Sequence, residues 1–144
     1  MPGWVEEGFK DYAGRMPRDC RLELREVPLG RRGKRADPAR AVAEEGERLL
    51  IASEGAVRVC LDMRGTAVDT QGLARLLADW LQQGEDVAFL VGGPDGLAPE
   101  CLAAARRRWS LSPLTLPHGL VRVLVAEQLY RAWTVIAGHP YHRD

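Results

Sequence analysis

Hydrophobic and polar positions along the chain divide it into segments with helical and strand-like periods. From residue 4 to 16, apolar and aromatic side chains recur at the spacing of one helix face, which predicts an amphipathic helix. Leu22 and Leu24 then alternate with Glu23 and Arg25, a period of two that predicts a strand with one covered face. The chain is therefore expected to begin with a helix and a strand.

The middle of the chain predicts a strand between two helices. Asp37 and Pro38 supply an N-cap and a favoured first helical residue for a helix that extends to about Ala52. A short apolar run over residues 57–61 predicts a strand, followed by Asp62 and a turn at Gly65. Residues 69–84 follow with a helical period that begins at an aspartate and ends at a glycine.

The next segment has the pattern of a buried strand followed by loops. Residues 87–91 have no polar side chain, which predicts a central strand covered on both faces, and the glycine-rich sequence GGPDG follows at 92–96. A short helix is expected over 98–105. Residues 109–116 alternate only in part and contain Pro113, which favours a strand end or an extended loop over an inner strand.

Strands that alternate with helices in this way indicate an α/β fold, with a mainly parallel sheet and helices on both faces. A chain of 144 residues, of which 46% are hydrophobic, is expected to form one domain over residues 1–144. Ligands of such folds bind beyond the carboxyl ends of the strands. Candidate positions for a site are therefore Leu61 and Asp62, residues 92–96 and residues 109–118.

The last predicted helix, over residues 118–137, is apolar around most of its circumference. One small sheet can cover only one face of it, so the other faces imply a partner, most simply the same helix of a second protomer in a homodimer. Glu127 and Arg131 are one helical turn apart and are expected to form an ion pair, which is more often structural than catalytic.

Composition and charge then narrow the class of protein. No apolar stretch reaches the length of a membrane span, and charges stand where a signal peptide would be apolar, so we expect a soluble cytoplasmic protein. The formal net charge is zero, so the overall charge does not indicate a nucleic-acid partner. Basic residues nevertheless cluster at Arg31, Arg32, Lys34 and Arg35, and again at 106–108. Three widely spaced cysteines predict free thiols.

The glycine-rich turn and the loop after it are candidate binding elements. Glycines at 92, 93 and 96 suit either a sharp turn or the close approach of a ligand. The turn lacks both the dinucleotide-binding and the phosphate-loop spacing, so neither nucleotide mechanism is supported. Residues 110–118 (SLSPLTLPH) are nearly uncharged and suit a wall that offers backbone groups to an adenine or ribose, although an ordinary connection would look the same.

The C-terminal residues 139–144 (HPYHRD) concentrate imidazole, phenol and guanidinium groups. Tyr and His can stack on a base, Arg can hold a phosphate, and His titrates near neutral pH, which suits RNA binding and proton transfer. A frayed end is the simpler interpretation. His139 and His142 lack further ligands, so no metal site is predicted.

These residues together closely resemble the ribosomal RNA large-subunit methyltransferase H family of the SPOUT class. The resemblance spans the chain, through MPGWVEEGF, GRRGKRAD, LVGGPDGL, WSLSPLTLPHGLVRVLVAEQLYRAW and HPYHRD. It implies an α/β fold with a C-terminal trefoil knot and methylation of N3 of a pseudouridine in large-subunit ribosomal RNA. It also implies S-adenosylmethionine as methyl donor and a homodimer that acts on assembled ribosomes.

The resemblance also assigns residues to roles. Those that would bind the cofactor are Leu61, Gly92, Gly93, Leu111, Ser112, Pro113, Leu114, Thr115 and Leu116. Those that would face RNA are Arg31, Arg32, Lys34, Arg35, Tyr141, His142 and Arg143. N3 of pseudouridine must lose a proton before it attacks the methyl group, and His142 is the candidate base.

The sequence departs from the family at its start. Family members begin with a further short apolar strand, and from the resemblance we expect that this chain lacks it. Such a gap would expose a sheet edge. Two other functions stay open: a ribosome- or RNA-binding knot protein without catalysis, and a SPOUT methyltransferase that acts on another RNA. A nucleotide hydrolase is disfavoured, since no phosphate loop or metal-ligand set is present.

Overall fold

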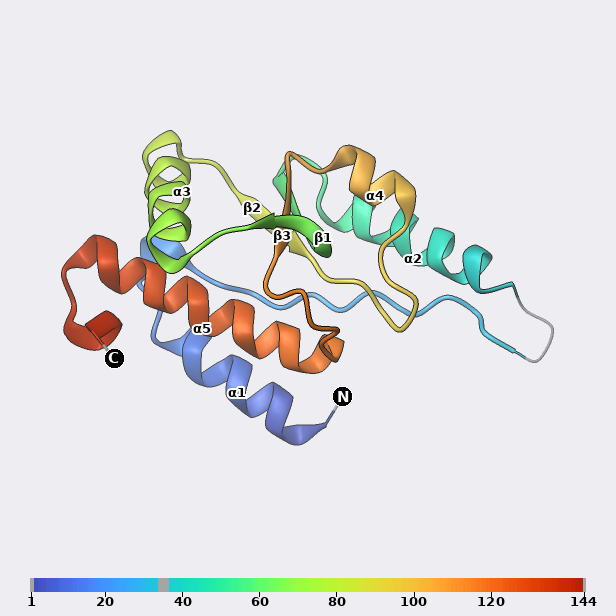
Figure 1. The fold of residues 1–144 in the computed structure, drawn as a ribbon, viewed down its shortest axis with the longest axis horizontal. Coiled ribbons are helices and arrows are strands. Elements are labelled where there is room, and N and C mark those ends of the chain that lie inside the picture. The colour runs from blue at the N-terminus through green and yellow to red at the C-terminus, as the bar shows by residue number, and fades with distance from the viewer. Residues whose placement is uncertain (1, 34–36, 144) are drawn as a thin grey trace. The chain divides into compact units, whose positions relative to one another are not determined.

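The structure is a computed structural model that describes residues 2–33 and 37–143 (Figure 1). Its elements in chain order are α1 (Gly3–Gly14), a 3-10 turn (Arg18–Cys20), α2 (Pro38–Ala52), β1 (Val57–Ala67), α3 (Thr70–Gln83), β2 (Val87–Leu90), α4 (Pro99–Ala104), β3 (Arg107–Ser110), α5 (His118–Ala137) and a second 3-10 turn (Pro140–Arg143). The predicted helices are all present. The chain is a mixed α/β protein, as the alternation of periods predicted.

The chain forms two compact units, each made of segments distant in sequence. The sheet unit comprises Arg25–Ala67 and Asp86–His118, and the helical unit comprises Met1–Leu24, Val68–Glu85 and Gly119–Asp144. The single-domain assignment stays a prediction. So does the knot.

The sheet unit is built on three parallel strands in the order β2-β1-β3. The expectation of a parallel sheet is therefore confirmed, but the placement of residues 87–91 at its centre was wrong. Among the described residues β1 is the middle strand, and β2 pairs with β1 alone. An apolar run indicates that both faces of a strand are covered by other side chains. It does not indicate whether one or two neighbouring strands pair with that strand. Within β2 only Leu90 is fully buried.

Strand β1 is longer than its apolar run, and the predicted turn at Gly65 is absent. Leu61 and Thr66 both pair with Trp109 of β3, so the ladder contains an irregularity between them and then resumes. A Cβ on Gly65 would lie 2.6 Å from the carbonyl carbon of Arg108. Glycine is thus required here because the backbones of β1 and β3 approach each other closely. Close backbone approach, like a turn, is a common reason for a glycine in a strand.

The core of the sheet unit lies between the sheet and the pair α2 and α4, which run side by side (Figure 1). One buried cluster of this core consists of Cys60, Leu90, Ala98 and Cys101. The thiols of Cys60 and Cys101 donate weak hydrogen bonds to the carbonyl oxygens of Cys101 and Gly46, at 3.4 and 3.5 Å. Burial raises the pKa of the Cys60 thiol to about 11, which keeps it protonated and unreactive.

The strand predicted around Leu22 and Leu24 is not formed. Residues 21–33 have no regular secondary structure, and the side chain of Leu24 is exposed. This segment is where the chain passes from the helical unit to the sheet unit. Alternation detects an extended backbone, but a strand also needs a neighbour for its backbone hydrogen bonds, and no local pattern reports one.

The helical unit is organised around α1 and α5, which lie alongside each other (Figure 1). Glycines on each helix permit close packing: a Cβ on Gly8 would lie 3.3 Å from Val123, and one on Gly119 would lie 3.1 Å from Val5. The hydroxyl of Thr70 at the start of α3 donates to Gln128 of α5. In the described part of the chain, no helix has the length and apolar character needed to cross a membrane.

Candidate functional site

The parallel register brings the predicted cofactor residues to one edge of the sheet. Cys60 of β1 is paired with Leu90 of β2 and with Arg108 of β3, so Leu61, Gly92 and Leu111 all follow the same level of the sheet. Gly92 and Leu111 follow the carboxyl ends of β2 and β3, and Leu61 lies within β1 at the level of those ends. This is the edge at which open α/β sheets bind ligands.

The glycine turn, residues 92–96, folds back on itself directly after β2. Gly93 and Gly96 form an isolated bridge, with a hydrogen bond of 3.1 Å from the Gly96 N–H to the Gly93 oxygen. A Cβ on Gly92 would lie 2.6 Å from the carbonyl carbon of Gly96, and Gly96 itself has a positive φ of 82°. Of the two reasons that the sequence left open for these glycines, the sharp turn is therefore the one the geometry requires.

The loop after β3 bends at Leu111, Pro113 and Leu114 and is held by hydrogen bonds of its own serines. Ser110 donates its hydroxyl to the Ser112 carbonyl oxygen at 3.2 Å, and the Leu114 N–H donates to the Ser112 hydroxyl at 3.0 Å. The Thr115 hydroxyl lies 3.9 Å from the sulfur of Met63, which joins the loop to the far part of β1. Of the two interpretations of residues 109–116, a strand end or an extended loop, the strand end is confirmed, because Trp109 and Ser110 are the last residues of β3.

Large apolar side chains are exposed around this edge. Leu114 in the loop is 69% exposed and Met63 on β1 is 53% exposed. Leu29 is 63% exposed, and its Cδ2 lies 3.4 Å from the position that a Cβ on Gly93 would occupy. Large exposed apolar side chains that gather at one place mark a binding surface more often than isolated ones do.

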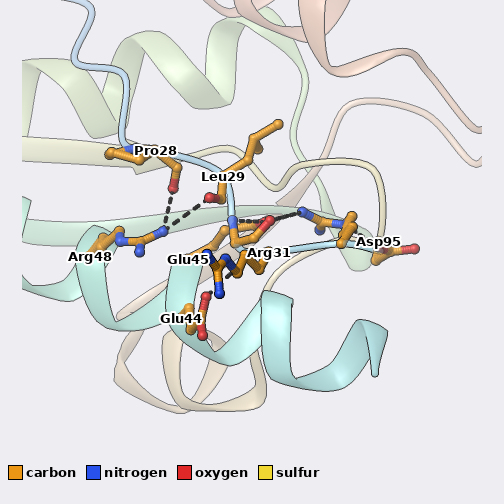
Figure 2. A network of polar contacts seen from close by, with 9 residues as sticks. Pro28, Leu29, Arg31, Glu44, Glu45, Arg48 and Asp95 are labelled. Atoms are coloured by element: carbon orange, nitrogen blue, oxygen red, sulfur yellow. Dashed lines mark hydrogen bonds and ion pairs between the residues drawn. The ribbon is translucent and has the colours of Figure 1, made fainter. Parts of the chain in front are cut away.

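A polar network connects the glycine turn to α2 and to residues 28–32 (Figure 2). The Arg32 guanidinium donates from Nε to Asp95 Oδ2 at 2.8 Å and forms an ion pair with the buried Glu45. The Gly30 N–H also donates to Glu45, at 2.8 Å. The hydrogen bond from Arg32 lowers the pKa of Glu45, against the opposing effect of burial, and the Gly30 N–H adds to the lowering.

Sequence reasoning assigned no role to Glu45 or Asp95. Asp95 belonged to a turn-forming sequence, where aspartate is common for local reasons. Glu45 stands among the apolar positions of the predicted helix, and that placement was the available signal. A carboxylate on the covered face of a helix needs a cationic or hydrogen-bonding partner.

The predicted RNA-facing arginines differ in their surroundings. Arg31 is exposed, and its backbone N–H donates to Glu44 at 3.3 Å. The side chain of Arg32 is 27% exposed and is bound to Glu45 and Asp95. Lys34 and Arg35 lie outside the described residues.

The C-terminal tail is tied to α5 through Tyr141. Its hydroxyl donates to Glu127 Oε1 at 3.1 Å, and its ring packs edge-on against Tyr130 with the Arg131 guanidinium 4.9 Å from its centre. The predicted pair of Glu127 and Arg131 is present at 2.6 Å. Burial raises the pKa of the Tyr141 phenol, and hydrogen bonds with Tyr12 and Glu127 raise it further. The side chains of His142 and Arg143 lie outside the described residues.

Among the described residues, no group of three or more histidines, cysteines, aspartates or glutamates is placed to hold a metal ion. The loop over residues 110–116 offers backbone amides, small hydroxyls and apolar side chains, and the glycine turn adds the carboxylate of Asp95. Such a surface can bind a neutral or mixed-polarity ligand.

Comparison with known proteins places the chain among methyltransferases. Residues 1–142 match a family described as "Predicted SPOUT methyltransferase". A protein of Alkalilimnicola ehrlichii named ribosomal RNA large subunit methyltransferase H is 64% identical over 143 residues, which cover 99% of this chain and 92% of the relative. A protein of Hahella chejuensis with the same name is 54% identical over 145 residues, covering 100% of this chain and 93% of that relative.

Proposed function

Because this chain belongs to the SPOUT methyltransferases, in the family of ribosomal RNA large subunit methyltransferase H, we propose that it methylates large-subunit ribosomal RNA. The proposed reaction is methyl transfer from S-adenosylmethionine to N3 of a pseudouridine. The observation that carries the proposal is the 64% identity to a protein of that name over 92% of its length. The geometry of the carboxyl edge supports it independently.

The residues at the carboxyl edge fit S-adenosylmethionine. The proposed binding residues are Leu61, Gly92, Gly93 and residues 111–116. The loop offers backbone amides and carbonyls for the polar parts of an adenosine, while the exposed side chains of Met63 and Leu114 offer apolar contact for its adenine ring. When bound, the cofactor supplies a methyl group on a positively charged sulfur.

The tail is proposed to face RNA and to remove the proton from N3. Tyr141 is a poor candidate for the base, because its raised pKa keeps the phenol protonated near neutral pH. His142 remains the proposed base, since an imidazole titrates near neutrality. His142→Ala should lower the single-turnover rate on ribosomes and leave the affinity for S-adenosylmethionine unchanged; an unchanged rate would exclude this role.

A homodimer is proposed through the exposed side of α5. At 100° per residue, the fully buried residues of α5 lie on one side, and Leu120, Leu124 and Val135 lie on the opposite side with intermediate burial. Apolar side chains on this second side of the helix are also expected to be covered. A second copy of the same helix across a two-fold axis provides that cover.

The proposed substrate is the assembled ribosome in the cytoplasm. The chain has no net charge, so it lacks the general electrostatic attraction by which many proteins hold free RNA. A large preassembled particle can supply the positioning, with Arg31, Lys34, Arg35, Tyr141 and Arg143 as proposed local contacts. Arg32 shared this assignment on the sequence alone, but its guanidinium is bound to Glu45 and Asp95 of the same chain.

Mass spectrometry of ribosomal RNA from a deletion strain tests the proposal. The RNA should lack one methylpseudouridine of the large subunit, and a plasmid with the intact gene should restore it. If no methylated pseudouridine disappears, the proposed substrate is wrong. Calorimetry with S-adenosylmethionine then separates a methyltransferase for another RNA, which binds saturably, from a binding protein without catalysis, which does not.

A further inference from the structure

Residues 28–32 form several hydrogen bonds with side chains of α2 (Figure 2). The Arg48 guanidinium donates to the carbonyl oxygens of Pro28 and Leu29 at 2.8 and 3.2 Å. The Gly30 N–H donates to Glu45 at 2.8 Å. Both anchors come from the same helix, so the backbone that leads to Arg32 has a defined position.

Gly30 brings this segment unusually close to α2. A Cβ at this position would lie 2.3 Å from the backbone oxygen of Ala41. Only glycine fits at such a distance, because the atom it would meet belongs to a helix backbone that cannot move aside. The Arg32 side chain therefore starts from a fixed point beside the helix.

The guanidinium of Arg32 bridges two carboxylates that are distant in sequence. Glu45 is on α2 and 5% exposed, whereas Asp95 lies in the glycine turn between Gly93 and Gly96. The ion pair uses Nη1 for Glu45 and Nε for Asp95. A planar fork of donors can serve two acceptors in fixed directions, which a lysine ammonium cannot reproduce.

Two of the glycines at the proposed cofactor site are thus held next to this network. A Cβ on Gly93 would lie 3.1 Å from Oε1 of Glu45, so the same carboxylate that binds Arg32 faces the turn directly. Glycine-rich turns have many accessible conformations, and one of them must be selected before a ligand can bind.

We infer that Arg32 is a positioning residue of the cofactor site: it clamps Asp95 of the glycine turn to Glu45 of α2 and so holds Gly92 and Gly93 ready for S-adenosylmethionine. This inference rests on the proposed function, because it assumes that the cofactor binds at that turn. It separates Arg32 from its neighbours in the basic cluster. Arg31 is exposed and suited to RNA, whereas Arg32 acts within the chain.

The test measures affinity for S-adenosylmethionine by calorimetry in the absence of ribosomes. Arg32→Ala and Asp95→Asn should each weaken binding by at least about ten-fold, the usual size of a charge-assisted hydrogen bond. Arg32→Lys should not restore it. The double variant should be little weaker than either single one, since both remove the same link. Arg40→Ala is the matched control: it removes an equal charge from an exposed residue of α2 and should change nothing.

If Arg32 instead contacts an RNA phosphate, the opposite pattern of effects on ribosome and cofactor binding is expected. Arg32→Ala would then raise KM for ribosomes and flatten its salt dependence while the affinity for S-adenosylmethionine stayed the same, and that result would overturn the inference. Should Arg32→Ala fail to fold, Asp95→Asn decides, because it keeps the shape of the side chain and removes its charge.

A second readout keeps the clamp separate from the proposed function. Hydrogen exchange of the backbone amides of Gly92, Gly93, Asp95, Gly96 and Leu97 in the unliganded protein should speed up in Arg32→Ala and in Asp95→Asn. If the wild type binds no S-adenosylmethionine but these amides still respond, the proposed cofactor is wrong and the clamp stands. If exchange is unchanged, the clamp itself is refuted.

Discussion

Gly46 on α2 packs directly against α4, and its missing side chain sets the distance between the two helices. A Cβ there would lie 2.5 Å from the Cβ of Ala98 and 3.4 Å from the sulfur of Cys101. Gly46→Ala should therefore lower the free energy of unfolding by roughly 1–3 kcal/mol, the usual cost of overpacking a core. Urea denaturation measures it. Gly14→Ala, with nothing within 4 Å of the added methyl, is the control and should not destabilise; equal losses in both would show that the close packing is wrong.

The Glu45 carboxylate makes part of the stability depend on pH. Its pKa in the folded protein lies below the ordinary 4.5, chiefly because of the Arg32 hydrogen bond. Its contribution is therefore complete above the unfolded value and is lost as the pH falls through the lower folded one. Glu45→Gln should be less stable by about 1–3 kcal/mol near neutral pH and lose less stability on acidification. Thermal melts over a pH series measure both; parallel curves for wild type and variant would contradict the assignment.

Single residues were predictable where their role is local. Asp37 and Asp69 cap their helices, with oxygens accepting from the N–H groups of Ala39 and Gly72 at 3.0 and 2.7 Å. Gly84 ends α3 with a positive φ. Arg32 and Asp95, in contrast, are 63 residues apart, and neither reveals its partner in the sequence.

At the scale of elements, helices followed from the sequence and strand pairing did not. A helix satisfies its own backbone, so its period and caps define it, as α2, α3 and α5 show. Strand β1 continues to Ala67 because β3 lies beside it. Residues 21–33, where the chain passes from one unit to the other, are in no strand. Both outcomes depend on neighbours distant in the sequence.

The exposed side of α5 provides an element-scale prediction. Leu124 lies opposite the fully buried residues of the helix and is the centre of the proposed dimer face. Leu124→Arg should convert a dimer into a monomer in sedimentation velocity, because it buries an unpaired charge in an apolar contact. Ile51→Arg places the same charge at a 67% exposed apolar position of α2 and should leave the dimer intact. Loss of the dimer in Ile51→Arg alone would place the interface elsewhere.

At the scale of the whole molecule, the proposed functions are divided between two units. The residues proposed to bind the cofactor belong to the sheet unit, whereas the dimer helix and the RNA-facing tail belong to the helical unit. The sequence indicated the carboxyl edge of a parallel sheet and the loop at 111–116, and the register aligns Leu61 of β1 with the ends of β2 and β3, after which the glycine turn and the loop follow. The chemical identity of the ligand came from resemblance, since glycines and small hydroxyls suit many ligands.

Methyl transfer measured directly tests the central claim. The purified protein is incubated with isotopically labelled S-adenosylmethionine and ribosomes from a strain that lacks the gene, and the RNA is digested and analysed by mass spectrometry. The account predicts label on N3 of one pseudouridine of large-subunit RNA. It predicts much less label when free large-subunit RNA replaces assembled ribosomes. Saturable binding of the cofactor without label in the RNA, or label only in another RNA, would contradict it.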